Sequence, residues 1–204
     1  MNKRMTVICK TIGNSSIVAD VGCDHGKIGA FLLENNKADK VFFCDISKQS
    51  LQKAKILCEK FGDRAEFYEQ DGLQSLCVDT AIIAGMGAME ILHIIKNAKL
   101  QPKNLLLQPM HSSEVLRQEL STMYKFEKDF LIYDGSKHYD IMKLSCGNDT
   151  FNQVELMFGK TNVTEHSADF NKYIKKEYAK CQAVLSTTYV ENIAVRLKLI
   201  KELL

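Results

Sequence analysis

The stretch IVADVGCDHGKIGAF, residues 17 to 31, decides the fold, because an apolar strand runs through a glycine-containing turn into a helix. The strand is predicted at Ile17 to Val21 and the helix at Lys27 to Asn35. The same alternation continues downstream, with helical patterns at 48–61, 88–97 and 113–124 and strands at 41–45, 65–68, 80–84 and 105–108. Strand, helix and strand at this rhythm indicate a parallel sheet with right-handed crossovers.

The chain divides near Gly147, where its composition changes. Before this point, two strands near 126–133 and 139–144 flank the short turn DGSKH, which indicates an antiparallel hairpin. After it, apolar residues recur at near-heptad spacing in two segments that residues 186–188 separate, which indicates a pair of helices. We therefore expect an α/β domain over residues 1–150 and a small helical-hairpin domain over residues 151–204.

The composition is that of one soluble, enzyme-sized domain with a small appendage. The 204 residues are 46% hydrophobic and 25% charged, and no apolar run approaches the roughly 18 residues that span a bilayer. The basic start MNKRMTVICK lacks the features of a signal peptide. Seven scattered cysteines without a CxxC pair argue against a disulfide framework and against a zinc cluster. We expect a cytoplasmic monomer with reduced thiols, no bound metal and no membrane contact.

The turn after the first strand does not fit a dinucleotide fingerprint. Its glycines, Gly22, Gly26 and Gly29, are spaced GxxxGxxG instead of GxGxxG, and Asp20 precedes the first of them by two residues. An acidic side chain at this position would repel a diphosphate, whereas S-adenosylmethionine has no phosphate and ends in a cationic amine. Asp20 can attract that amine or organise the loop, while glycine lets the backbone approach the ligand. The pattern favours a methyl-donor loop over an NAD site.

Acids or glycines also follow the next three strands. Asp45 ends the second strand, where it can hold a ribose diol, and Asp71 with Gly72 follows the third, near the adenine. Gly85 follows the fourth strand, where the donor's methyl group should face the acceptor. The predicted cofactor-binding residues are Asp20, Gly22, Cys23, Gly26, Asp45, Ile46, Asp71, Gly72, Ala84 and Gly85.

Each acid in this set also has a plain structural interpretation. Asp20 can cap a helix, Asp45 can lie in a turn, and Asp71 with Gly72 can form a type I′ turn. Open α/β sheets, however, bind ligands at the carboxyl ends of their strands, and all of these residues fall there. Their joint placement favours a cofactor site.

Taken together, these motifs make the sequence resemble the bacterial tRNA (adenine-22-N1)-methyltransferase family. The resemblance covers essentially the whole chain and rests on Lys3-Arg4-Met5, Asp20-Val21-Gly22-Cys23-Asp24-His25, Asp45, Asp71-Gly72-Leu73, Ile83-Ala84-Gly85-Met86-Gly87, Leu107-Gln108-Pro109, Asp134-Gly135-Ser136-Lys137, Tyr139 and Phe158-Gly159. It implies a Rossmann-like class I methyltransferase sheet with a coiled-coil-like C-terminal domain, S-adenosylmethionine as cofactor and tRNA as partner. The chain departs from the family at Ala88 and Met110, where Gly and Asn are usual, and at Lys27-Ile28-Gly29, where a leucine-proline pair is usual.

The expected reaction is methyl transfer to N1 of an adenine. No polar or aromatic side chain follows the fourth strand to hold an amine, whereas N1 carries an in-plane lone pair and needs no base before the methyl moves. We expect backbone carbonyls near Ala84 and Gly85 to orient the adenine and Met86 to replace its lost stacking. Asp24 or His25 would tune the electrostatics, so the candidate catalytic residues are Asp24, His25, Gly85, Met86 and Gln108.

RNA would have to be held by local basic patches, because the net charge is only +2. The candidates are Lys3, Arg4, Lys10 and Lys27 near the cofactor loop and Lys172, Lys175, Lys176 and Lys180 on one predicted helix, although lysines on a helix are often only solvated. Two alternatives stay open: a methyltransferase acting on another RNA, a small molecule or a protein, and an RNA-binding module that retains the fold without catalysis.

Overall fold

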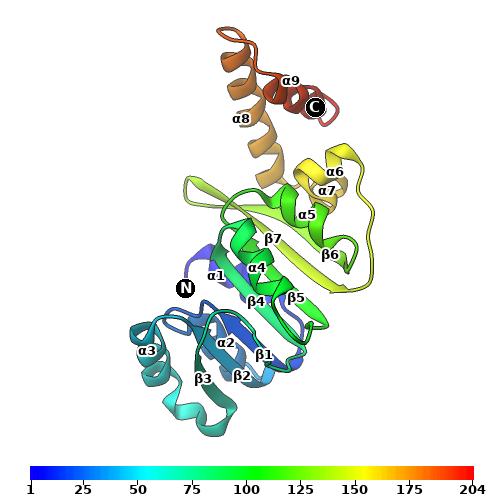
Figure 1. Cartoon of the computed structure of the whole chain (residues 1–204). Helices are drawn as coiled ribbons and strands as arrows, with labels where there is room; N and C mark the ends of the chain where they lie inside the picture. The colour runs from blue at the N-terminus through cyan, green and yellow to red at the C-terminus, as the bar shows by residue number, and fades with distance from the viewer.

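One seven-stranded sheet forms the centre of the computed structural model, which describes residues 1–204 (Figure 1). The strand order is β3-β2-β1-β4-β5-β7-β6, and the strands are β1 Ser15–Val21, β2 Ala38–Asp45, β3 Ala65–Glu69, β4 Thr80–Met86, β5 Asn104–Pro109, β6 Tyr124–Asp134 and β7 Lys137–Cys146. Strands β1 to β5 are parallel, whereas β7 runs antiparallel to β5 and β6. The predicted sheet with a final antiparallel hairpin is therefore confirmed.

Helices connect successive parallel strands, except between β3 and β4, and cover both faces of the sheet. They are α1 Lys3–Thr11, α2 Lys27–Glu34, α3 Lys48–Cys58 with the 3₁₀ turn Glu59–Arg64, α4 Ala88–Lys96, α5 Ser113–Leu120, α6 Gln153–Phe158, α7 Lys160–Glu165, α8 Ala168–Leu185 and α9 Glu191–Lys201. The Ser47 hydroxyl caps α3 by accepting from the Ser50 N–H at 3.2 Å. Helix α5 ends four residues before its predicted end, because Tyr124 begins β6 and its hydroxyl donates to the Pro102 carbonyl at 2.9 Å.

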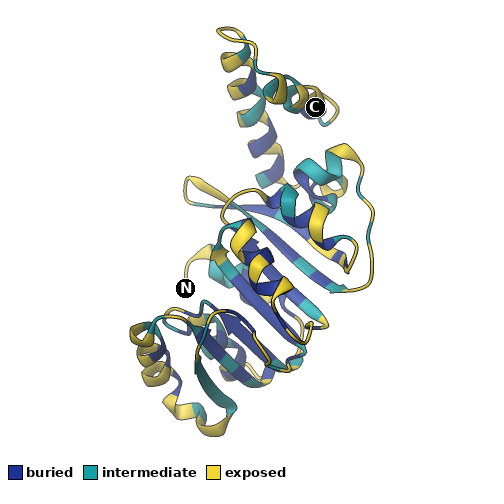
Figure 2. Ribbon diagram, in the orientation of Figure 1, coloured by how far each residue is buried: buried dark blue, intermediate teal, exposed yellow.

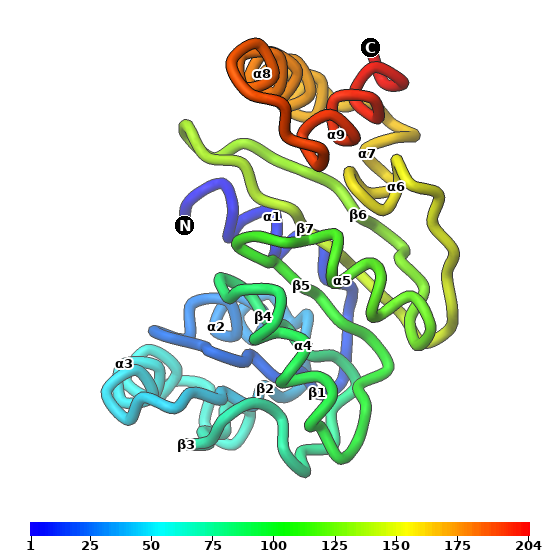
Figure 3. The backbone as a smooth tube through the Cα atoms, turned by 45° about the horizontal axis from the view of Figure 1, so that its top comes forward, coloured from blue at the N-terminus to red at the C-terminus, as the bar shows by residue number.

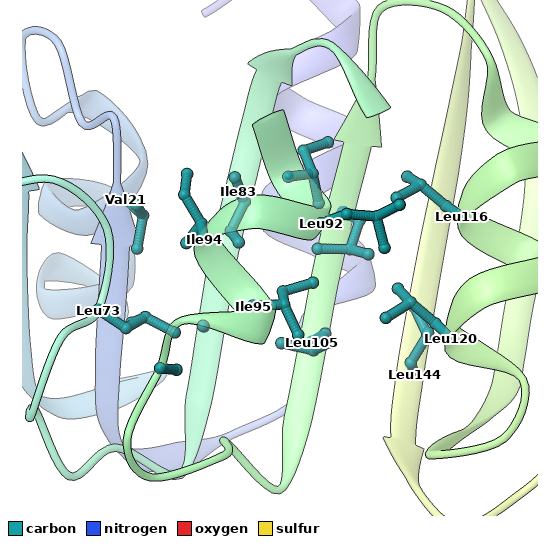
Figure 4. Packing of buried hydrophobic residues seen from close by; sticks show 14 of the residues in the cluster. Val21, Leu73, Ile83, Leu92, Ile94, Ile95, Leu105, Leu116, Leu120 and Leu144 are labelled. Atoms are coloured by element: carbon teal, nitrogen blue, oxygen red, sulfur yellow. The ribbon is translucent and has the colours of Figure 1, made fainter. Parts of the chain in front are cut away.

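The two faces of the sheet bury separate apolar clusters, because successive strand residues point to opposite sides. Along β4, Ala81 and Ile83 belong to the cluster beneath α4 and α5, whereas Ile82 belongs to the cluster beneath α1, α2 and α3. Figure 4 shows Leu92 of α4 and Leu116 of α5 in the first cluster. The central strands are buried and the outer surfaces of the helices are exposed (Figure 2).

Three short helices were not predicted. Helix α1 begins at the side chain of Asn2, whose oxygen accepts from the Met5 N–H at 2.9 Å, and it buries Ile8 and Cys9 against the sheet. Helices α6 and α7 have six residues each. A capping box between Asn152 and Glu155 begins α6, and its N-x-x-E pattern is visible in the sequence.

The predicted C-terminal pair of helices is present as α8 and α9. Figure 1 shows α8 extending away from the edge of the sheet, and Figure 3 shows α9 beside it. The inner part of α8 is not detached from the sheet, because Phe170 and Ile174 share an apolar cluster with Leu131 and Tyr133 of β6. The two predicted domains therefore pack on one another, and the boundary between residues 150 and 151 stays a prediction.

None of the helices combines the length and the apolar character needed to cross a membrane. All seven cysteines are free thiols.

Candidate cofactor and acceptor site

A cavity of about 150 Å³ lies where the strand order reverses between β1 and β4, at the carboxyl ends of both strands. In open α/β sheets this reversal is the usual place for a ligand. Helix α1 closes one side of the cavity. The wall includes, from the predicted set, Arg4, Asp20, Gly22, Cys23, Asp24, His25, Lys27 and Ala84, and it adds Met5 and Ile8 of α1.

The loop between β1 and α2 has a conformation that its glycine spacing makes possible. Gly22 and Gly26 have φ angles of +66° and +68°, in the left-handed region that favours glycine. The N–H groups of Gly22 and Cys23 donate to the Cys44 carbonyl at 2.8 and 3.1 Å, which ties the loop to β2. A Cβ at Gly29 would overlap the ring of Phe43, so the third glycine lets α2 approach the sheet.

The buried Asp20 side chain holds this loop against the start of α2. Its side chain is 3% exposed, and its Oδ2 accepts from the Gly29 N–H at 3.0 Å, in the first turn of α2. Burial, with a smaller contribution from the nearby Asp45 carboxylate, raises the pKa of Asp20 to about 7, although the hydrogen bond from the Gly29 N–H opposes this rise. A carboxyl that ionises near neutrality, at the wall of the cavity, can respond to a cationic ligand. Burial likewise raises the pKa of the Cys23 thiol, so this cysteine is not a nucleophile.

The second acid, Asp45, joins the first loop to the end of β2. Its Oδ2 accepts from the Asp24 N–H at 3.0 Å, and its Oδ1 accepts from the Ser47 N–H at 2.8 Å. A carboxylate offers about four acceptor positions, so two remain for ligand hydroxyls. Ile46 beside it is 74% exposed, so its side chain offers an apolar surface against which the adenine ring of a cofactor could pack.

Of the third pair, Asp71 is exposed, whereas Gly72 is buried with φ +70° and lies against Ile94. Neither residue lines the cavity beside β1, so their predicted contact with the adenine stays a prediction.

The end of β4 carries a β-bulge that sequence patterns did not reveal. Ala84 pairs with Gln108 and Met86 pairs with Pro109, so Gly85 between them is left out of the ladder. Gly85 is exposed and has φ +84°, which frees its peptide groups for a ligand. Met86 points back toward the first loop, because a Cβ at Gly22 would overlap its terminal methyl.

Gln108 is turned inward, and its amide is already satisfied. It is 1% exposed, its Oε1 accepts from Arg4 Nη1 at 3.0 Å, and its Nε2 donates to the Pro109 carbonyl at 2.7 Å. The guanidinium of Arg4 also lies over the Tyr139 ring, 5.0 Å from its centroid. Gln108 thus supports Arg4, and Arg4 lines the cavity. The sequence did not indicate this contact between the two residues.

Asp24 and His25 form a small polar group at the mouth of the cavity. His25 Nε2 lies 3.6 Å from Asp24 Oδ1 and 3.2 Å from Lys53 Nζ. Asp24 has φ +50°, and its side chain is 76% exposed. His111, which was not predicted, covers Gly87, since a Cβ there would lie 3.0 Å from its ring. No cluster of three metal-ligating side chains is present.

The predicted RNA-binding residues have different surroundings. Lys3 pairs with Asp169 at 2.9 Å, Lys180 pairs with Glu177 at 3.5 Å, and Lys172 Nζ lies 4.4 Å from the centroid of the Tyr133 ring. The remaining lysines of the set, Lys10, Lys27, Lys175 and Lys176, are exposed. The structure brings only Arg4 and Lys27 to the cavity.

Parallel strands β1 to β5, a reversal between β1 and β4, and a cavity at that reversal define a Rossmann-like cofactor-binding enzyme. The glycines of its first loop, Gly22, Gly26 and Gly29, are spaced GxxxGxxG, unlike the GxGxxG of dinucleotide-binding members of that class. The chain belongs to the methyltransferase domain family, whose model matches residues 1–142.

Similar proteins agree with this assignment. The chain is 26% identical over 157 residues to the tRNA (adenine(22)-N(1))-methyltransferase of Bacillus subtilis, a match that covers 72% of this chain and 66% of that protein. A structure of M. capricolum TrmK in complex with S-adenosyl-homocysteine superposes with a TM-score of 0.86 and 25% identity, covering 99% of this chain and 96% of that one. The B. subtilis TrmK structure superposes with a TM-score of 0.86 at 23% identity, covering 100% of this chain and 98% of that one.

Proposed function

We propose that this protein transfers a methyl group from S-adenosylmethionine to N1 of adenine 22 in tRNA. Membership of the methyltransferase domain family supports the reaction type, and the curated relative supports the acceptor. The observation that carries the proposal is the joint position of Asp20, Arg4 and the Gly85 bulge at one switch point of the sheet.

The charges of the cavity suit a ligand with a zwitterionic tail. Asp20 offers a buried carboxyl for the ammonium group, and Arg4 offers a guanidinium for the carboxylate. Arg4 is available for this role because its guanidinium contacts an amide oxygen, a sulfur atom and the Tyr139 ring, and no carboxylate. Asp45 has acceptor positions for the ribose hydroxyls. The cofactor supplies an electrophilic methyl group, and these residues bind and orient it.

The acceptor side is built from backbone rather than from side chains. We assign the freed peptide of Gly85 to orient the adenine edge, with His111 over Gly87 on the neighbouring wall. Adenine N1 is nucleophilic without losing a proton, so correct positioning is the main requirement. Methylation leaves a positive charge on the base, which the exposed Asp24 carboxylate stabilises. Gln108 acts as a positioning residue through Arg4.

The exposed lysines Lys10, Lys27, Lys175 and Lys176, with Lys172, supply contacts to the tRNA backbone in this proposal. The free thiols support a reducing compartment, and we propose a cytoplasmic monomer. Size-exclusion chromatography with light scattering tests the oligomeric state.

Radiolabelled S-adenosylmethionine and unmodified tRNA transcripts test the proposal. Wild-type protein should label a transcript with adenine at position 22 and should not label a matched transcript in which uridine replaces it. Equal labelling of both transcripts would contradict the position, and labelling of neither would contradict the acceptor. Binding of S-adenosyl-homocysteine, measured by calorimetry in parallel, shows whether the protein sample is competent.

A further inference from the structure

A second pocket of about 230 Å³ lies where the sheet meets the C-terminal helices. One wall is the turn from Pro109 to Glu114 between β5 and α5, and the second is the start of β7 from His138 to Asp140. Met157 of α6, Tyr173 of α8 and Arg196 of α9 complete it. We call it the junction pocket, because both parts of the chain contribute to it.

The junction pocket and the proposed acceptor site share the turn that follows β5. Pro109 pairs with Met86 at the end of β4, and the Met110 N–H donates to the Met86 carbonyl at 2.9 Å. His111, which lines the junction pocket, also covers Gly87. A nucleotide next to the target adenine would therefore reach this pocket along the same turn.

The walls of the junction pocket combine aromatic faces with acceptors. The His138 and Tyr173 rings have centroids 4.6 Å apart, and His138 is exposed. Asp140 and Glu114 face the same space, and Asp140 Oδ2 accepts from the Ser113 hydroxyl at 2.5 Å. Rings and carboxylates together suit a nucleobase that carries an exocyclic amine, as adenine, guanine and cytosine do.

The charges of the pocket do not favour a phosphate. Its one arginine, Arg196, is paired with Glu177, with Nε 3.2 Å from Oε2, and donates to the Tyr173 hydroxyl at 2.6 Å. The Glu114 and Asp140 carboxylates would repel an anion, even though Asp140 Oδ1 also lies 3.9 Å from Arg117 Nη2. The occupant is therefore a base and not the backbone.

We propose that the junction pocket holds the base of a nucleotide adjacent to the methylated adenine, stacked on His138. This rests on the proposed function, and it adds a second point of RNA recognition that neither part of the chain can provide alone. The base would be selected for its exocyclic amine, so uracil would fit worse than adenine, guanine or cytosine.

The test pairs His138→Ala with the control His166→Ala, an exposed histidine that contacts Phe170 and lies outside the pocket. Each protein is assayed on an intact transcript and on transcripts with an abasic residue immediately 5′ or 3′ of the target. We expect His138→Ala to lower kcat/KM on the intact transcript about tenfold, the effect of about 1.4 kcal/mol of base stacking. His166→Ala should keep the wild-type kcat/KM, and neither variant should change the affinity for S-adenosyl-homocysteine.

With the wild-type protein, one of the two abasic transcripts should give a kcat/KM about tenfold below that of the intact transcript. With His138→Ala, the same abasic transcript should give no further loss of kcat/KM, because both changes remove the same contact. Full activity of His138→Ala on the intact transcript, or losses that multiply at both flanking positions, would overturn the proposal. RNA binding is measured alongside by fluorescence anisotropy with S-adenosyl-homocysteine present. If no transcript is methylated, the proposed function fails, and the same pattern in binding still decides whether a base occupies the pocket.

Discussion

Replacing Arg117 with methionine should destabilise the protein strongly, because Arg117 forms a bidentate ion pair with Asp129 in its interior. Both side chains are 0% exposed, with Nε 2.8 Å from Oδ2 and Nη2 3.0 Å from Oδ1. Arg117 Nη1 also donates to the carbonyls of Leu156 and Met157 at 3.1 and 3.3 Å, where α6 ends. The pair therefore fastens the C-terminal helices to α5 and β6.

The expected cost follows from the carboxylate that the substitution leaves behind. Breaking a buried ion pair at one partner costs about 3–5 kcal/mol, a large share of the roughly 5–15 kcal/mol that stabilises a typical domain. Burial already raises the pKa of Asp129, and losing Arg117 raises it further. An acid whose folded pKa is raised loses stability as pH increases toward that pKa. The destabilisation should therefore be smaller at pH 5 than at pH 8.

Urea denaturation monitored by circular dichroism measures this effect. Lys103→Met is the matched control, because Lys103 is 76% exposed in its pair with Asp79, and such pairs contribute about 0–1 kcal/mol. The double variant Arg117→Met/Asp129→Leu should recover much of the lost stability, since it removes the fully buried carboxylate. Only the partly exposed Asp140, whose Oδ1 lies 3.9 Å from Arg117 Nη2, then loses a charged partner. An Arg117→Met protein within about 1 kcal/mol of wild type would refute this reasoning. A double variant no more stable than the single one would refute it as well.

Three further outcomes are expected. Gly29→Ala should lower the free energy of unfolding by about 1–3 kcal/mol in thermal denaturation, because its Cβ would overlap Phe43, whereas Gly13→Ala at an exposed site should change it little. Arg4→Gln should weaken calorimetric binding of S-adenosyl-homocysteine about ten- to hundredfold while leaving that of 5′-methylthioadenosine, which lacks the amino-acid tail, unchanged; an equal loss for both ligands would contradict its role. Affinity for S-adenosyl-homocysteine should rise about eightfold from pH 6 to pH 7.5 as Asp20, with its pKa of about 7, ionises. Asp20→Asn should lack this rise, and a variant that kept it would exclude Asp20 as its source.

The sheet and the first loop were predictable because their signals are local. An apolar run, an acid at its end and glycines at fixed spacing specify the β1 turn within a dozen residues, and the structure places Asp20 and Gly22 at the cavity as expected. The N-cap at Ser47 and the hairpin turn at residues 134–138 are local signals of the same kind.

The remaining features depend on contacts that are distant in sequence. Arg4 reaches Gln108 across 104 positions, so neither residue reveals the other in the sequence. The predicted catalytic role of Gln108 stays a prediction, with its side chain 1% exposed and bonded to Arg4. The Gly85 bulge depends on the register between β4 and β5, which a single sequence does not encode visibly. Helix α1 was missed because a nine-residue segment gives a weak periodic signal.

The proposed reaction is methyl transfer to adenine N1 by a site that positions the base through backbone groups. Its most direct test is mass spectrometry of nucleosides from a tRNA transcript that the wild-type protein has methylated, digested at neutral pH so that the methyl group does not migrate. The expected product is N1-methyladenosine, absent when position 22 is not adenine. N6-methyladenosine as the primary product would contradict it, because that reaction requires the polar side chain that the end of β4 does not provide.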